Sequence, residues 1–290
     1  MLKQRIATGV VLVVAFLAAL FASSPLVFIG FCWLAILIAS WEWSAFAELS
    51  APTQRAGFVA FIGALMIAIF VAGGFYAQSF AEPIVAGQIN LSTLQTLFYF
   101  AAAFWLAVLL LLLGYPRGQQ LWSSQIMRLL LGIIMLSLAW AAILFIRYHG
   151  HGQFWVIYVV AVVVCADVGA YFAGKTFGHI KLAPAVSPGK SWEGLIGGLL
   201  VALLFALGLT QWFATRPESP LPEQGVLLLV TAVLAGASVL GDLFESMLKR
   251  GCGLKDSGNI LPGHGGVLDR IDGLTAALPI FALLALSLGW

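Results

Sequence analysis

The sequence predicts an all-α polytopic membrane protein with about nine transmembrane helices, and three observations support this fold class. Hydrophobic residues make up 62% of the 290 residues, while charged residues make up only 9%. The mean hydropathy is +1.03. The apolar residues also gather into runs, several of which are long enough to cross a bilayer as helices. A water-soluble single core is therefore excluded, and the net charge of +2 is spread too thinly over the chain to indicate a nucleic-acid partner.

Nine apolar runs are separated by polar or glycine- and proline-rich connections, one of which contains Glu82. The first run follows Lys3 and Arg5, which is also how a secretory signal begins, in this case one cleaved near Ala22 or Ser24. A second run follows at once, so we favour an uncleaved helical hairpin. The predicted spans cover residues 6–21, 26–39, 57–75, 96–113, 129–146, 154–172, 195–209, 226–243 and 274–290.

An aromatic and mildly polar segment follows the second run, and this composition favours a position among the lipid headgroups. Its Glu42 and Glu48 are expected to be solvated. Trp41 and Trp43 in this segment, together with Trp290 at the C-terminus, are expected to anchor the chain at the membrane interface.

The basic residues indicate the orientation of the bundle. Nine spans place the two termini on opposite sides of the membrane, and of the 14 Lys and Arg residues only Arg147 and Arg216 fall on the side of the C-terminus. The remaining 12 fall on the side of the N-terminus, which the positive-inside rule assigns to the cytoplasm. The loops 173–194 and 244–272 then lie on the cytoplasmic face, and the C-terminus lies on the outer side.

Aspartate is distributed unevenly over the two halves of the chain. All five Asp residues lie in the C-terminal half, at positions 167, 242, 256, 269 and 272. We therefore divide the chain into an N-terminal transmembrane scaffold of about five helices, residues 1–150, and a C-terminal transmembrane catalytic region of about four helices, residues 151–290. The scaffold is expected to provide structural support, lipid contact or the interface of a homodimer.

The segment 241–273 is the polar exception in this apolar chain. If the eighth run continues as a helix beyond its apolar part, Asp242 and Lys249 share one face of that helix. Glu245 and Ser246, at the i+3 and i+4 positions from Asp242, lie on the same face between them. One end of the eighth helix is therefore expected to present acidic, hydroxyl and cationic groups together.

A second pair of carboxylates, Asp269 and Asp272, stands where the ninth run begins, so that three carboxylates including Asp242 can face one point. Mg2+ takes carboxylate oxygens and is usually completed by waters and substrate phosphates. The glycines of the sequence PGHGG, residues 262–266, would let backbone N–H groups approach an anion. The segment therefore predicts a metal and phosphate site.

The same segment carries four short motifs at fixed spacing. They read S-x-x-K-R from Ser246, K-D-x-G from Lys255, L-P-x-H-G-G from Leu261 and D-R-x-D from Asp269. Together they resemble the signature of the phosphatidate cytidylyltransferases, also called CDP-diacylglycerol synthases, and so long a gapless match is specific. The resemblance implies that CTP condenses with phosphatidic acid to give CDP-diacylglycerol and pyrophosphate, a step of phospholipid biosynthesis.

A second block, in the sixth run and after it, also resembles this family. Its first element is Asp167, a carboxylate inside an apolar span, which is costly and marks a functional candidate. The alternative interpretation is a buried hydrogen bond between helices. Tyr171 follows one helical turn later.

The block continues in the loop SPGKSWEG, residues 187–194. Ser187, Lys190 and Ser191 would offer hydroxyls, a cation and free N–H groups to a triphosphate at the start of a helix. The alternative is ordinary capping, with Ser191 as the N-cap and Glu193 in the first turn.

The resemblance also implies roles for these residues. We assign the metal, Mg2+ with Mn2+ as an alternative and a second cation left open, to Asp242, Asp269 and Asp272. The proposed catalytic set comprises Asp242, Lys249, Arg250, Asp269, Arg270 and Asp272. The proposed substrate-binding set comprises Asp167, Tyr171, Ser187, Lys190, Ser191, Glu193, Ser246, Lys255, Asp256, His264, Gly265 and Gly266.

Some of these assignments have structural alternatives. Asp256 and the other aspartates can instead form ion pairs with Arg250 or Arg270. Lys255 can instead anchor at anionic lipid headgroups. Glu193, like Glu245, can support the ligands without touching the metal.

Two other functions fit parts of the sequence. A cation-coupled transporter would also carry a carboxylate such as Asp167 inside a span and an interrupted helix such as the one at Pro279. The charges, however, gather at one face rather than at the midplane. An alcohol phosphotransferase acting on CDP-linked lipids would need an arginine in the stretch DGLTAA from Asp272, which has none.

The two substrates of a cytidylyltransferase set the location of its site. CTP is available in the cytoplasm, whereas a diacyl lipid is confined to the bilayer. We therefore expect an integral protein of the bacterial inner membrane whose active site faces the cytoplasm and whose partners are CTP, phosphatidic acid and membrane lipids.

Overall fold

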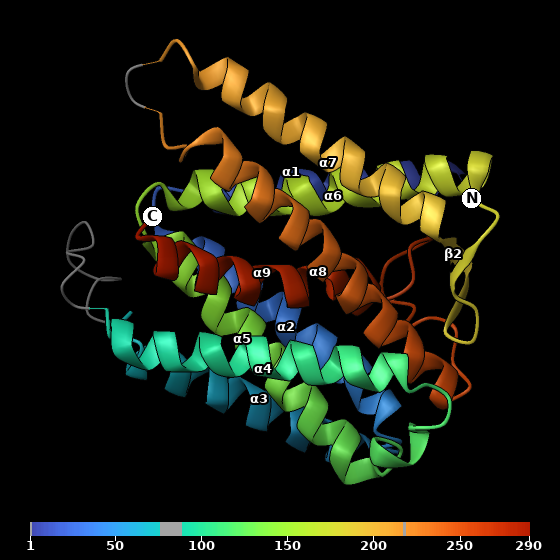
Figure 1. Ribbon diagram of the computed structural model, residues 1–290. Helices are drawn as coiled ribbons and strands as arrows, with labels where there is room; N and C mark the ends of the chain where they lie inside the picture. Colours follow the sequence, from blue (N-terminus) through green and yellow to red (C-terminus); the bar gives the residue numbers. More distant parts are fainter. Residues whose placement is uncertain (1, 76–88, 217–218) are drawn as a thin grey trace.

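The computed structural model describes residues 2–75, 89–216 and 219–290, and the helices dominate this part of the chain (Figure 1). The predicted polar connection around Glu82 lies outside the described residues. The α-helices are α1 (Leu2–Leu20), α2 (Pro25–Phe46), α3 (Pro52–Ala72), α4 (Leu91–Leu113), α5 (Gln125–Tyr148), α6 (Gly152–Phe177), α7 (Trp192–Phe213), α8 (Gln224–Gly251) and α9 (Leu268–Leu288).

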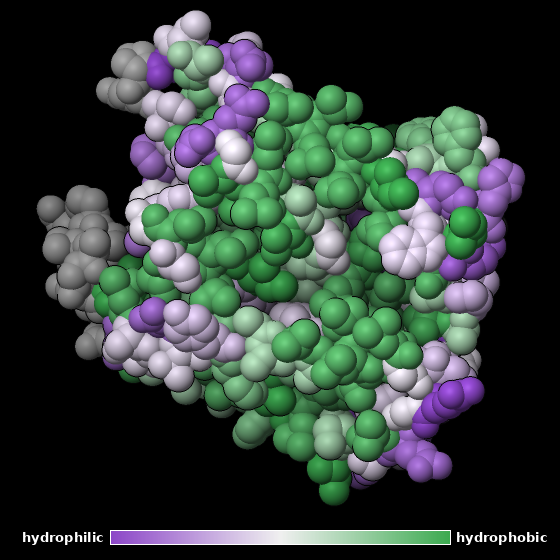
Figure 2. Space-filling view, in the orientation of Figure 1, coloured by the Kyte–Doolittle hydropathy of each residue, from purple (hydrophilic) through white to green (hydrophobic). Residues whose placement is uncertain are grey.

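The predicted all-α membrane fold is confirmed. Within the described residues, 8 helices, α2 to α9, are long and apolar enough to cross a membrane. The remaining helix, α1, has a shorter apolar stretch, Ile6–Leu20. Figure 2 shows the consequence on the surface, where a broad apolar band lies between hydrophilic groups at the two ends of the bundle.

The helices run back and forth between two ends of the bundle (Figure 1). One end, which we call the hairpin end, carries the N-terminus and the connections 47–51, 114–124, 178–191 and 252–267. The C-terminus lies at the opposite end. Both loops predicted to carry the site are therefore at the same end of the molecule.

Short elements complete the hairpin end. A 3-10 turn, η3 (Gln119–Leu121), precedes α5. Strands β1 (Lys181–Ala183) and β2 (Ser187–Ser191) form an antiparallel hairpin, with Lys181 opposite Ser191 and Ala183 opposite Ser187. The stretch predicted as a loop before α7 is thus partly a strand, because the turn between β1 and β2 lets the two segments pair.

Close helix crossings set the positions of the polar residues. A Cβ on Gly169 of α6 would come within 2.8 Å of the Gly197 carbonyl oxygen of α7, so these two helices touch through small residues. At the crossing of α8 with α9, a Cβ on Gly241 would collide with the Asp272 carbonyl oxygen. Because glycine allows this approach, Asp242 on α8 lies next to the first turns of α9.

The predicted interfacial segment after the second run is the end of α2, and two expectations about it are wrong. Trp43 is fully buried, and its Nε1 donates to the Arg128 carbonyl oxygen at 2.8 Å. Glu42 is only 3% exposed, so it is not solvated. The reason is that α2 continues helically to Phe46 and packs against α5 and α9 instead of lying among the headgroups.

The other residues expected at the membrane interface, Trp41, Glu48 and Trp290, differ in how exposed they are. Trp41 remains 38% exposed, and the Arg55 guanidinium lies 5.7 Å from its ring centre. Glu48 is also exposed and pairs with Arg128. Trp290 is half-buried and stacks on Trp155, with 5.2 Å between the ring centres.

Candidate active site

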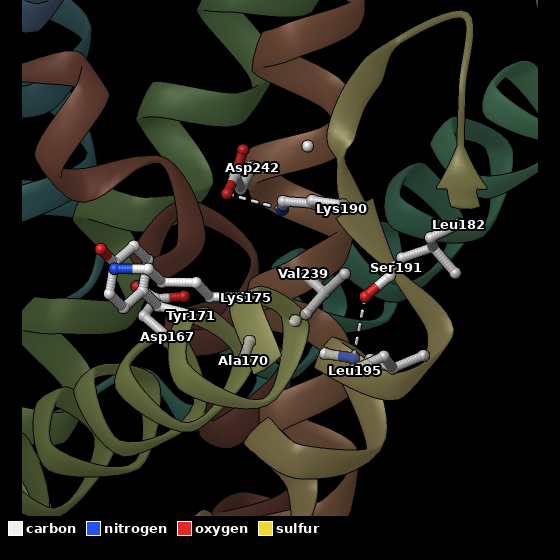
Figure 3. A pocket seen from close by; sticks show the side chains of 13 residues that line it. Asp167, Ala170, Tyr171, Lys175, Leu182, Lys190, Ser191, Leu195, Val239 and Asp242 are labelled. Atoms are coloured by element: carbon white, nitrogen blue, oxygen red, sulfur yellow. Dashed lines mark hydrogen bonds and ion pairs between the residues drawn. The ribbon is translucent and has the colours of Figure 1, made fainter. Parts of the chain in front are cut away.

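A cavity of about 470 Å³ opens between α6, α7, α8 and β2 at the hairpin end (Figure 3). Its polar lining includes predicted site residues from both motif blocks, which are far apart in the sequence. These residues are Asp167, Tyr171, Lys190, Ser191 and Asp242. The cavity also has an apolar wall, to which Ala170, Leu195 and Val239 contribute.

An ion pair joins the two blocks across this cavity. The Lys190 Nζ of β2 lies 2.6 Å from the Asp242 Oδ2 of α8, and the two side chains are 25% and 34% exposed. The other carboxylate oxygen of Asp242 accepts a hydrogen bond from Ser246 Oγ at 3.2 Å. The predicted sharing of one α8 face by Asp242 and Ser246 is confirmed, because α8 extends to Gly251.

Asp167 and Tyr171 lie one turn apart on α6 and both line the cavity (Figure 3). The negative charges of Asp167 and Asp242 are close enough to interact. We use the name cavity cluster for Asp167, Tyr171, Lys190 and Asp242. The cluster combines carboxylates with a cation that a phosphate could attract away from Asp242.

Sequence analysis overlooked one cation of this cavity. Lys175 lines it, and its Nζ lies 5.7 Å from the centre of the Tyr171 ring. The signal was available, because Lys175 follows Tyr171 by four residues and therefore lies on the same face of α6.

Ser191 adopts the capping geometry that the sequence left as an alternative. It is 3% exposed, and its Oγ accepts a hydrogen bond from the Gly194 N–H at 3.1 Å. Glu193 accepts from the Ile180 N–H at 3.1 and 3.2 Å and thereby ties the hairpin to the start of α7. Ser187, at the other end of β2, does not line the cavity.

A second group of charges lies where α8, α9 and the loop between them meet. Lys249 Nζ donates to Glu245 Oε2 at 3.0 Å and to Asp269 Oδ1 at 2.7 Å. The Asp269 carboxylate also accepts hydrogen bonds from the N–H groups of Ser257, at 3.0 and 3.2 Å, and Gly266, at 2.8 Å. We use the name loop cluster for Glu245, Lys249, Ser257 and Asp269.

The loop cluster is enclosed, unlike the cavity cluster. The side chains of Lys249, Glu245 and Asp269 are only 12%, 1% and 8% exposed. The hydrogen bond to Asp269 also occupies the Gly266 N–H, which was predicted to approach an anion. In this conformation the charged groups of the loop cluster bind one another and backbone N–H groups.

Asp272 stands between the two clusters. Its Oδ1 accepts a hydrogen bond from the Gly273 N–H at 2.7 Å. In the described chain it forms no ion pair with Lys190 or Lys249. Its charge interacts with those of Asp242 and Glu245. Asp272 therefore connects Asp242 of the cavity cluster with Glu245 of the loop cluster.

The residues present match the donor chemistry of a hard cation but do not form a complete chelate. Among the described residues, no group of three or more His, Cys, Asp or Glu side chains is arranged to hold a metal ion. Two of the three predicted metal ligands are instead in ion pairs, Asp242 with Lys190 and Asp269 with Lys249. The Glu245 side chain is 1% exposed and lies close enough to Asp272 for the two carboxyl groups to share a hydrogen bond.

The two predicted arginines donate hydrogen bonds to backbone carbonyl oxygens and do not line the cavity. Arg250 Nε donates to the Val186 carbonyl oxygen at 3.3 Å, and Arg270 Nη2 donates to the His264 carbonyl oxygen at 2.8 Å. Neither guanidinium pairs with a carboxylate in the part of the chain that the structure describes. The alternative in which they hold Asp256 or its neighbours is therefore wrong.

The remaining predicted residues belong to the loop before α9. Lys255 and Asp256 are exposed. His264 is half-buried, and its Nδ1 is buried without a hydrogen-bond partner. Gly265 has a φ of +82°, a left-handed conformation that favours glycine. These four positions do not line the cavity.

Comparison with known proteins gives consistent matches over the whole chain. A model of the cytidylyltransferase family matches residues 3–288. The chain is 40% identical to the phosphatidate cytidylyltransferase of Haemophilus influenzae, over 97% of this chain and 98% of that relative. It is 38% identical to the phosphatidate cytidylyltransferase of Pseudomonas aeruginosa, over 100% of this chain and 99% of that relative.

A third relative, less similar to this chain, carries the same name. The phosphatidate cytidylyltransferase of Bacillus subtilis is 34% identical to this chain, over 98% of each protein. The similarity therefore extends beyond the two motif blocks and includes the N-terminal helices.

Proposed function

This chain belongs to the cytidylyltransferase family, and we propose that it joins CTP to phosphatidate in the cavity between α6, α7, α8 and β2. The products are CDP-diacylglycerol and pyrophosphate. The observation that carries the choice of site is the Lys190–Asp242 ion pair, which brings both motif blocks to one cavity.

The proposed reaction needs no protein nucleophile. A phosphate monoester has a second pKa of about 6, so the phosphate of phosphatidate is largely a dianion at neutral pH. One of its oxygens attacks the α-phosphorus of CTP and forms a new P–O bond. The P–O bond to the β-phosphate breaks, and pyrophosphate leaves with the electron pair.

The protein has to bring two anions together and stabilise the leaving group. We assign to Lys190 and Lys175, which line the cavity, the binding of triphosphate oxygens. In this proposal the incoming phosphate displaces Asp242 from Lys190, because both partners of that ion pair are accessible. We also assign phosphate contacts to Arg250 and Arg270, which lie outside the cavity lining and would exchange a carbonyl oxygen for a phosphate oxygen.

Mg2+ remains part of the proposal. The carboxylates of Asp242 and Asp272 would hold it, and Asp269 can join them only after its ion pair with Lys249 opens. When bound, the ion would neutralise charge on the triphosphate and on the departing pyrophosphate. Mn2+, with the same preference for oxygen ligands, would act in the same way, and a second cation would have to use the remaining carboxylates.

The cavity also suits a lipid substrate because of its place in the bundle. It lies at the end of apolar helices, and Val168 and Ile196, which directly follow the lining residues Asp167 and Leu195 in the sequence, are exposed. A headgroup can therefore enter the polar lining while its acyl chains stay in the bilayer. We infer that the hairpin end faces the cytoplasm of a bacterial inner membrane, since that end carries most of the basic residues.

The N-terminal helices also remain candidates for a homodimer interface. Val10 and Val14 of α1 and Phe61 and Ile67 of α3 are exposed apolar side chains. Such residues face either lipid or a second copy, and cross-linking of single cysteines placed there would distinguish the two.

Release of pyrophosphate by the purified protein in detergent tests the function. We expect release only when CTP, phosphatidate and Mg2+ are all present, and we expect EDTA to stop it. The Glu48→Gln variant, altered at an exposed residue of the hairpin end outside the cavity, serves as the matched control and should keep full activity. Release without phosphatidate, or no release from folded protein with any divalent cation, would refute the proposal.

A further inference from the structure

Glu42 is a buried carboxylate in the N-terminal half that the reaction scheme above does not use. It lies near the end of α2 and is 3% exposed. Among the side chains that the structure describes, no Lys, Arg or His lies within ion-pair distance of it. Burying an unpaired charge is costly, so a specific set of donors must compensate for it.

Those donors come from the site-bearing end of the chain. Glu42 Oε1 accepts from the Val267 N–H at 3.0 Å, and Glu42 Oε2 accepts from the Leu268 N–H at 2.8 Å. Ser257 Oγ donates to Glu42 Oε2 at 3.3 Å. A carboxylate of α2 thus satisfies N–H groups at the start of α9, which has no side-chain cap of its own at Val267.

This position is electrostatically favourable for a carboxylate. The first N–H groups of a helix have no partner within the helix, and the helix dipole attracts negative charge to that end. Hydrogen bonds from backbone N–H groups to a carboxylate are stronger than those between neutral groups. The same helix start carries Asp269 and Asp272, so Glu42 fixes the element on which they stand.

The loop before α9 is shaped around this carboxylate. A Cβ on Gly258 would come 2.5 Å from Glu42 Oε1, and a Cβ on Gly266 would come 2.6 Å from Glu42 Oε2. Ser257 connects the contact to the loop cluster, since its N–H donates to Asp269 while its hydroxyl donates to Glu42. Two carboxylates from different helices therefore hold one loop.

We propose that Glu42 is a positioning residue for cytidylyl transfer, which fixes the first turn of α9 and the 252–267 loop against α8. The inference rests on the proposed function, because it takes the carboxylates of α9 to act in the reaction. It gives the N-terminal half a direct part in forming the site. Glu42 contacts neither the cavity nor any cavity-cluster residue.

The test is the Glu42→Gln variant, which keeps the size of the side chain and one carbonyl oxygen but removes the charge. We expect kcat for pyrophosphate release to fall by about 10- to 100-fold, since small displacements of reacting groups have effects of this size. The KM for CTP should change by less than about threefold, because the cavity lysines are untouched. Glu42→Asp keeps the charge on a shorter side chain, so its kcat should lie between those of the wild type and Glu42→Gln.

A purely structural role would give a different result. In that case Glu42→Gln would lower the Tm, but the folded protein recovered by gel filtration would keep the wild-type kcat. That outcome would overturn the proposal, as would a normal kcat at a normal Tm. The control Glu48→Gln removes a carboxylate just beyond the end of the same helix and should leave kcat unchanged, while a fall in its Tm measures only the loss of the ion pair with the buried Arg128.

A milder variant decides the question if Glu42→Gln does not fold. Ser257→Ala removes only the hydroxyl that bridges to Glu42, and we expect a severalfold lower kcat together with faster tryptic cleavage after the exposed Lys255. Unchanged kcat and unchanged cleavage would overturn the proposal. If the wild-type protein itself releases no pyrophosphate, the proposed function fails, while the cleavage rates still report whether Glu42 holds the loop.

Discussion

The cavity cluster and the loop cluster contain the same kinds of side chain but differ in how these are engaged. In the cavity cluster, Lys190 and Asp242 form an ion pair in which both side chains remain about a quarter to a third exposed. In the loop cluster, Lys249 and Asp269 are nearly enclosed, and backbone N–H groups saturate the carboxylate. The comparison teaches that the segment 241–273 contributes Asp242 to an accessible ion pair and Lys249 and Asp269 to an enclosed one, so residue type alone does not decide which charges stay accessible.

The largest expected effect is on activity in the cavity cluster. Asp242→Asn removes a proposed metal ligand and the partner of Lys190, so we expect pyrophosphate release to fall by about 100-fold or more. The Tm should change little, because an accessible ion pair contributes about 1 kcal/mol or less. Activity within threefold of the wild type would remove Asp242 from the proposed mechanism.

The next largest effect is on stability, and it should be large for substitution of Lys249 and small for substitution of Lys190. Lys249→Met leaves Glu245 and Asp269 buried without their cation, which should cost about 3 kcal/mol and lower the Tm markedly. Lys190→Met should leave the Tm almost unchanged but raise the KM for CTP. Thermal unfolding of the two purified variants measures the difference, and equal Tm values would contradict the distinction between the clusters.

A substitution at the α8 and α9 crossing tests whether the clusters depend on each other. Gly241→Ala forces a Cβ against the Asp272 carbonyl oxygen, so the helices must separate and activity should fall by about tenfold. Gly236→Ala, on the same helix with no atom within 4 Å of its Cβ, is the matched control. It should stabilise α8 by about 0.5–1 kcal/mol and leave activity unchanged. Equal activity of both variants would show that the crossing does not position the site.

The smallest expected effect concerns the cation that sequence analysis overlooked. Lys175→Gln should raise the KM for CTP by about three- to tenfold with little change in kcat, because the residue lies at the cavity wall and pairs with no carboxylate in the described chain. Steady-state kinetics in detergent measures this change. An unaltered KM would place the triphosphate elsewhere in the cavity.

The sequence by itself determined the membrane fold, the family resemblance and the two motif segments, which meet at the cavity. Apolar runs specify membrane helices because each backbone polar group must be satisfied within its own segment. The spacing of Asp242, Ser246 and Lys249 likewise determined which α8 residues share a face, since helical periodicity is local. These conclusions need no knowledge of distant contacts.

Only the tertiary structure decided which charges are paired and which side chains are buried. Glu42 was expected to be solvated, yet it binds N–H groups more than 200 residues further along the chain. The pairing of Lys249 with Asp269 likewise depends on how α8 packs against α9, and the pairing of Lys190 with Asp242 depends on how β2 lies against α8. Composition near Glu42 could not reveal its burial, because the groups that compensate its charge belong to another helix and meet it only after packing.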